Sequence, residues 1–163
     1  MTPAPSSDTP SATVLAALTH ADAAWALADA ELREAAWVGA DLHLRLSALP
    51  VSWRGEGGRT EHGHVSGLAL VCVGAQGVQG APLAEALGRL HEGQWRASAQ
   101  PGEPGEPGQP PSAWQRRWPL ASPVPGPLHL VLGLPHRSEL ALNTLGLHLL
   151  PWGPLRLYPS LAC

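Results

Sequence analysis

The stretch LHLVLGLPHRSELALNTLGLHL, residues 128–149, decides the fold. Leucine alternates with other residues over 128–134 and again from position 140, which is the period of a β-strand with one buried face. The sequence PHRS at 135–138 is typical of a turn, so the stretch predicts an antiparallel hairpin. The leucines change phase between Leu142 and Leu145, and we expect a β-bulge at Asn143-Thr144 to restore the inward face.

A second hairpin is expected at residues 25–48. Leu42, Leu44 and Leu46 alternate with polar residues, and the sequence VGAD at 38–41 supplies a turn before them. The segment 13–37 is ambiguous, because apolar residues also recur there at the three- and four-residue spacings of a helix. We expect a short helix at about 12–22 followed by the hairpin, with helix over the whole of 13–37 as the alternative.

Residues 64–75 form the third expected strand. Apolar side chains occupy both of its faces, which is typical of a central strand. Two other segments are expected to be irregular. Residues 54–63, RGEGGRTEHG, have the composition of a polar loop, and residues 151–163 contain three prolines and are expected to follow the surface as a tail.

These elements predict one mainly β domain, an antiparallel β-sandwich or barrel built from hairpins with a short N-terminal helix. Residues 1–12 are expected to form a disordered tail, and residues 13–163 the domain. The sequence SAQPGEPGEPGQPPSA at 98–113 predicts a flexible Pro/Gly-rich insertion between strands.

Composition excludes several classes of protein. The 163 residues carry only 14% charged side chains and a net charge of −3, which argues against a coiled coil and against a basic domain for double-stranded nucleic acid. The longest apolar run has nine residues, 67–75, so we expect no membrane span. No positive residue precedes the first apolar segment, and two cysteines make no disulfide framework. We therefore expect a reduced, cytoplasmic protein in which Cys72 is buried and inert.

Three histidines form a candidate metal site. His62 and His64 stand two positions apart, so in an extended chain both imidazoles reach one side. The sequence EHGH at 61–64 resembles the first signature of cupins, which are metal-binding jelly-roll proteins. The resemblance implies a third ligand after a Pro/Gly turn, for which PGPLH at 125–129 offers His129, but Leu68 and Ala69 stand where cupins place a glutamate.

A second candidate site is the sequence WQRRW at 114–118. Tryptophan faces and arginine forks bind sugars, nucleotides or single strands, so Trp114, Arg116, Arg117 and Trp118 could hold such a ligand. The competing interpretation is that one tryptophan packs in the core while both arginines stay in solvent.

Nucleophile and phosphate-loop motifs are missing from the sequence, so an enzyme is the less favoured class. We expect a small bacterial-type β-domain that acts as a non-enzymatic binding or accessory module for a protein partner and needs no cofactor. Formation of a homo-oligomer is compatible with this expectation. The first alternative is a cupin-like enzyme holding one divalent metal ion at His62 and His64. The second is a carbohydrate or nucleotide binder that uses the 114–118 stretch.

Overall fold

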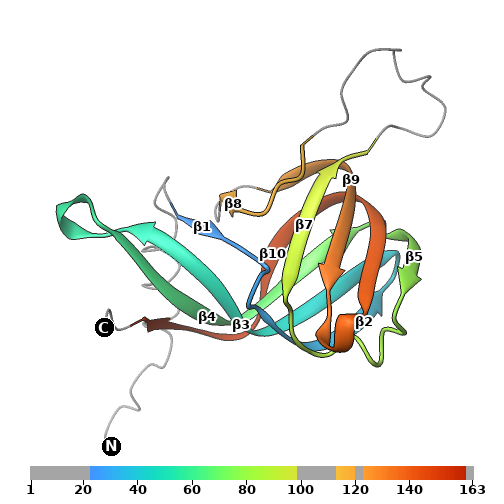
Figure 1. Ribbon diagram of the computed structural model, residues 1–163, viewed down its shortest axis with the longest axis horizontal. Helices are drawn as coiled ribbons and strands as arrows, with labels where there is room; N and C mark the ends of the chain where they lie inside the picture. Colours follow the sequence, from blue (N-terminus) through green and yellow to red (C-terminus); the bar gives the residue numbers. More distant parts are fainter. Residues whose placement is uncertain (1–22, 99–112, 120–122, 161–163) are drawn as a thin grey trace, which may run out of the picture.

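The structure is a computed structural model that describes residues 23–98, 113–119 and 123–160 (Figure 1). Every strand pairing in it is antiparallel, which confirms the predicted mainly β fold. The strands are β1 (Ala24–Trp25), β2 (Glu31–Val38), β3 (Asp41–Arg54), β4 (Thr60–Val73), β5 (Gln76–Gly80), β6 (Gly88–Arg89), β7 (Glu92–Ala97), β8 (Trp118–Pro119), β9 (Val124–Gly133) and β10 (Glu139–Pro159). Two single 3₁₀ turns, η1 (Glu56–Gly58) and η2 (Pro135–Arg137), complete the elements. Across this described part of the chain, no helix has the length and apolar character needed to cross a membrane.

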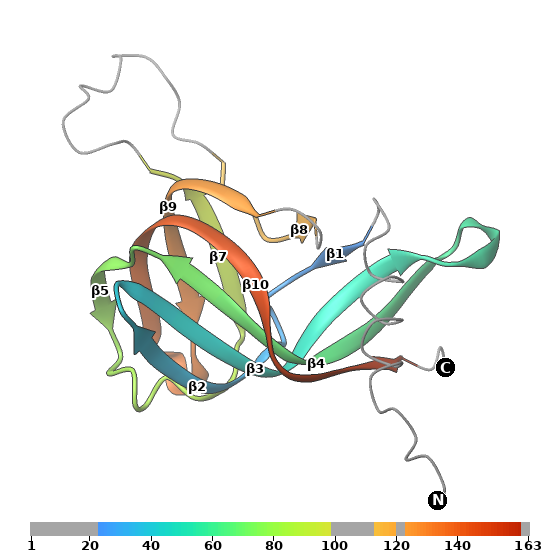
Figure 2. The ribbon, with the colours of Figure 1, turned by 180° about the vertical axis from the view of Figure 1, so that it is seen from behind.

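The sheet curls until its two ends meet. Its strand order is β6-β2-β3-β4-β10-β9-β7, and the terminal strands β6 and β7 are consecutive in the chain. Because β6 pairs with β2 while β7 pairs with β9, the segment 88–97 joins the two edges and closes the curl. We call this closed part the barrel; Figures 1 and 2 show it from opposite sides.

Three strands continue beyond the barrel. Strands β3 and β4 have 14 residues each and β10 has 21, against about 5–6 for an average strand. Where these strands leave the barrel, the buried side chains change from even-numbered to odd-numbered positions. Leu46 and Leu49, three positions apart, are both buried, and so are Val65 and Leu68. On β4 the change falls at Gly67, whose φ of +85° suits glycine. We call the projecting part, residues 49–54, 60–66 and 155–159, the arm (Figure 2).

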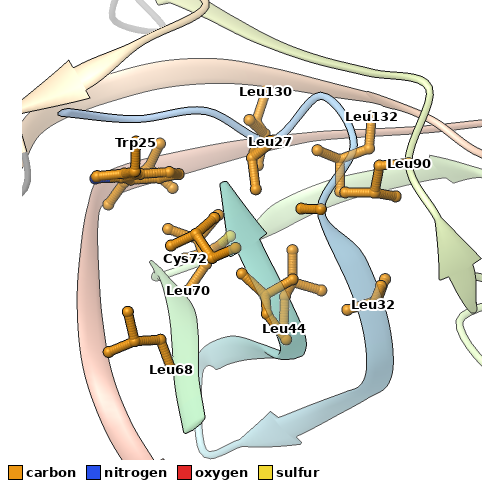
Figure 3. Close-up of a cluster of buried hydrophobic side chains, with 14 of the residues drawn as sticks. Trp25, Leu27, Leu32, Leu44, Leu68, Leu70, Cys72, Leu90, Leu130 and Leu132 are labelled. Carbon is orange, nitrogen blue, oxygen red and sulfur yellow. The ribbon is translucent and has the colours of Figure 1, made fainter. Parts of the chain in front are cut away.

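Leucine fills the barrel. Leu44, Leu70 and Leu130 come from β3, β4 and β9 and point toward one another with Leu27 in the centre of Figure 3. The core continues toward the arm through Trp25, which stacks on Trp118 with ring centroids 4.0 Å apart. Each buried leucine stabilises the fold by about 1.5–3 kcal/mol relative to exposure. Tryptophan therefore supplies the bulk that a chain without phenylalanine otherwise lacks.

Both expected hairpins are present. Strands β2 and β3 turn at Gly39 and Ala40, and β9 and β10 turn through η2. The irregularity expected at Asn143-Thr144 lies between Thr144 and Gly146, and its extra residue is in β9, where Gly126 and Pro127 are opposite Leu145. Thr144 is buried and its Oγ1 donates to the Val73 carbonyl at 2.7 Å, while Leu145 is turned out and 62% exposed.

Two expectations about irregular segments are wrong. Residues 54–63 are not a loop, because β3 and β4 pair out to Arg54 and Thr60 with only η1 between them. Gly63 is a strand residue, and glycine is required there because a Cβ would lie 2.7 Å from the Tyr158 carbonyl oxygen and 3.1 Å from the Trp53 ring. Residues 151–159 are not a surface tail either, because β10 continues to Pro159, paired with β4 after a register shift at 151–156 that accommodates Pro154, while residues 161–163 lie outside the described part.

The predicted helix at 12–22 and almost all of the insertion at 98–113 lie outside the described residues, and so does the tail at 1–12.

Candidate functional site

The four residues of the 114–118 stretch do not share one surface. Trp118 is in the core, 1% exposed. Arg116 pairs with Glu92 at 3.0 Å, and Arg117 Nη2 donates to Ser52 Oγ. Trp114 is 37% exposed and lies against the barrel.

The three histidines are also separated. His62 and His64 are exposed on one face of β4, in the arm. His129 lies on β9 opposite Asn143, whereas His64 lies opposite Tyr158, fifteen positions further along β10. Over residues 23–98, 113–119 and 123–160, no three His, Cys, Asp or Glu side chains come together as metal ligands. The described chain thus offers the two arm imidazoles no third ligand.

Arg117 lies on the same side of the arm as His62 and His64. Strand β8 pairs with β1 and β1 with β3, which sets Ala24 between Pro119 and Ser52. Arg117 reaches past the small Ala24 side chain to the Ser52 hydroxyl. Ser52 is the cross-strand partner of His62, so the hydroxyl that Arg117 contacts and the His62 side chain are on the same face of the arm.

This side of the arm is positively charged. Directly opposed residues and residues two apart in a strand share a face, which adds Arg54 and Arg156 to Arg117. We call this surface the arm face: Pro50, Ser52, Arg54, Thr60, His62, His64, Ser66, Arg117, Arg156 and Tyr158. None of these positions is acidic. Glu61 lies on the opposite face, where Trp53 Nε1 donates to its carboxylate at 2.9 Å.

A carboxylate, that of Glu31, belongs to a residue that is paired just before the arm begins. Glu31 on β2 is opposite Ala48, which precedes the arm on β3. Among the described residues, the ion pairs of the chain involve Arg45, Arg89 and Arg116. The arginines of the arm face therefore have no carboxylate partner within that part of the chain.

A second polar cluster crosses the outside of the barrel. Arg96 on β7 is opposite His129 on β9, His129 is opposite Asn143 on β10, and Asn143 is opposite Gln76 on β5. We call these four residues the polar row. His129 Nδ1 lies 3.0 Å from Asn143 Oδ1. Four strands thus place an arginine, a histidine and two amides side by side.

Trp114 covers one end of the polar row. The Arg96 guanidinium carbon lies 4.6 Å from the centre of its ring, and the His129 ring centroid is 6.0 Å away. At the other end, a groove of about 290 Å³ opens beside Asn143 and Gln76. Its remaining lining residues are Gly74, Ser98, Pro127, Thr144 and Leu145. The segment 99–112 connects Ser98 in this groove to Ala113 beside Trp114.

No motif in the sequence points to Arg96, Asn143 or Gln76 as site residues. The pairing of His129 with Asn143 could have been predicted from the sequence, because the turn at 135–138 places Gly133 opposite Glu139 and this fixes the register of the hairpin. Arg96 and Gln76 belong to strands whose partners are far away in the chain, and the sequence carries no signal for their register.

Cys72 plays no part in either cluster. Its side chain is fully buried, and burial, with a smaller contribution from the Asp41 carboxylate, raises the pKa of the thiol to about 12. The expected burial is confirmed. A thiol with this pKa is protonated at neutral pH and is a poor nucleophile.

The chain matches no protein-family model, and searches of curated proteins and of solved structures return no similar protein.

Proposed function

We propose that this protein is a non-enzymatic binding module whose arm face docks an acidic segment of a protein partner. The observation that carries the proposal is the set of three arginines, Arg54, Arg117 and Arg156, on a face without a carboxylate. The chain as a whole has a net charge of −3. A local positive surface on a negative molecule directs an acidic partner to that surface and disfavours other approaches.

The face, and not the edge, of the arm is the proposed contact. The edge of β10 carries Pro151, Pro154 and Pro159, which have no N–H to offer an added strand. Exposed ion pairs contribute only about 0.2–1 kcal/mol each. The partner must therefore also bury apolar surface, which Pro50 and the 53% exposed Tyr158 provide on the same face.

Other residues of the face support recognition of oxygen-rich groups. Thr60 and Ser66 bring hydroxyls between the cations, while the buried Ser52 holds Arg117 in place. Backbone pairing holds all of them on adjacent strands, so the donors are positioned before binding. The buried free thiol of Cys72 fits the cytoplasmic location that we include in the proposal.

The test uses two variants that lose the same charge. Arg54→Ser/Arg156→Ser removes two cations from the arm face; Arg33→Ser/Arg137→Asn removes two exposed cations from β2 and η2. Binding of a labelled peptide of alternating Glu and Ser is followed by fluorescence anisotropy at low and at physiological salt. Native lysate is then passed over each immobilised protein, and the captured proteins are quantified.

We expect the arm variant to bind the peptide about tenfold more weakly and to lose its captured proteins, and the control variant to behave as wild type. Equal losses in both variants would show that net charge alone is responsible and would overturn the proposal. Absence of peptide binding to the wild type at low salt would also overturn it.

A further inference from the structure

We propose that the polar row and Trp114 form a binding site for a monosaccharide-sized ligand that carries one anionic group. The site is on the outside of the barrel and shares no residue with the arm face. It therefore goes beyond the proposed function and can stand or fall independently of it.

Arg96 is the anion-binding group of this site. Its guanidinium carbon lies 4.6 Å from the centre of the Trp114 ring, and this contact restrains the side chain. No carboxylate of the described residues forms an ion pair with it. A planar, preoriented guanidinium pairs with a carboxylate or a phosphate through two parallel hydrogen bonds.

His129 and Asn143 supply groups for hydroxyls. An amide oxygen only accepts hydrogen bonds, so the 3.0 Å contact requires the proton on His129 Nδ1. In the neutral ring, Nε2 is then an acceptor. Asn143 Nδ2 points toward β5, where a Cβ on Gly77 would lie 3.2 Å from it. Gln76 lines the groove on the same strand and adds a second amide.

The walls of the groove are apolar. Leu145 is 62% exposed at the register shift between β9 and β10, and it lines the groove together with Pro127. Bulges often occur where a strand has to redirect a side chain at a functional site. Sugar rings present C–H faces as well as hydroxyls, and an aromatic or aliphatic wall beside polar groups matches both.

The volume limits the size of the ligand. The groove of about 290 Å³, which Asn143 and Gln76 of the polar row line, is just below the roughly 300–1,000 Å³ found for small-molecule sites. It fits one ring and not a chain of rings. The anionic group can be a carboxylate, as in a uronic acid, or a phosphate, as in a sugar phosphate, because Arg96 pairs with either.

The experiment is isothermal titration of the full chain with glucuronate, glucose 6-phosphate, glucose and inorganic phosphate. Arg96→Gln removes the anion-binding group. Asn143→Asp adds a negative charge that repels the anionic ligand, with almost no change in the shape of the site. Arg116→Gln is the matched control, since Arg116 is nearby but points to Glu92. Thermal unfolding shows whether each variant remains folded.

We expect one of the two anionic sugars to bind at least about tenfold more tightly than glucose or inorganic phosphate. Both site variants should lose this preference, and Arg116→Gln should keep it. Preference for glucuronate or for glucose 6-phosphate identifies which anion the site takes. Equal binding of inorganic phosphate and sugar phosphate, an equal loss in Arg116→Gln, or no binding of either sugar acid at millimolar concentration would overturn the proposal.

Discussion

Raising the pH from 9 to 12 should destabilise this protein mainly through one thiol, that of Cys72. In the folded state its pKa is about 12, raised from 9.0 by burial and by the nearby Asp41 carboxylate. The folded protein therefore keeps the proton while the unfolded chain loses it, so stability is fully present below pH 9 and falls as the pH rises toward 12. From these two values the loss is about 1.4 kcal/mol at pH 10 and about 2.7 kcal/mol at pH 11.

Few other side chains of this protein ionise between pH 9 and pH 12. It contains no lysine, one tyrosine, two cysteines and otherwise only arginine as a basic group besides histidine. Arginine stays protonated up to pH 12 and histidine is neutral above pH 9. In a Cys163→Ser/Tyr158→Phe background, Cys72 is thus the remaining side chain that ionises in the window.

The free energy of unfolding should be measured by urea denaturation at pH 8, 9, 10 and 11, followed by tryptophan fluorescence. The same series on Cys72→Val in that background gives the reference slope. We expect the parent to lose stability with pH as stated and the valine variant to stay nearly level. If both lose the same amount, or if the parent is level up to pH 11, the thiol ionises as easily in the folded state as in the unfolded one. The proposed burial of Cys72 would then be refuted.

Two further predictions concern stability. Gly93→Ala should lower the free energy of unfolding by about 1–3 kcal/mol, because the new Cβ would lie 2.3 Å from Leu27 Cβ. Gly153→Ala, whose Cβ would meet nothing within 4 Å, should change it by less than about 1 kcal/mol. Chemical denaturation compares the two variants, and equal effects would show that the packing around Leu27 is looser than described. Thr144→Val should cost about 1–3 kcal/mol, because it removes the one hydroxyl proton that the carbonyls of Val73 and Gly146, at 2.7 and 2.8 Å from Thr144 Oγ1, share. A neutral result in the same assay would mean that this hydroxyl contributes nothing to stability.

The leucine pattern was sufficient to predict an antiparallel sandwich or barrel, and its failure at the arm has a physical cause. In β9 and β10, alternate leucines face a core that only a curled sheet can cover, so Leu130 and Leu142 identify both strand and face. In the arm, a strand needs only Val51 and Val65 to bury, and the other face is polar. Gly63 and Pro154 then suggest a loop and a tail, although one gives room to a neighbouring ring and the other sits at a register shift.

The candidate sites were harder to predict because register, and not distance in the sequence, decides which side chains meet in a sheet. Trp114 and Trp118 are four residues apart, yet one is on the barrel surface and the other in the core. Arg117 meets Ser52 through β1, and Arg96 meets His129 through the pairing of β7 with β9. Some residues singled out from the sequence recur in the two candidate sites: Arg117, His62 and His64 in the arm face, and His129 in the polar row with Trp114 at its end. The sequence suggested the wrong neighbours for them, because each pairing depends on bulges and on connections whose lengths carry no periodic signal.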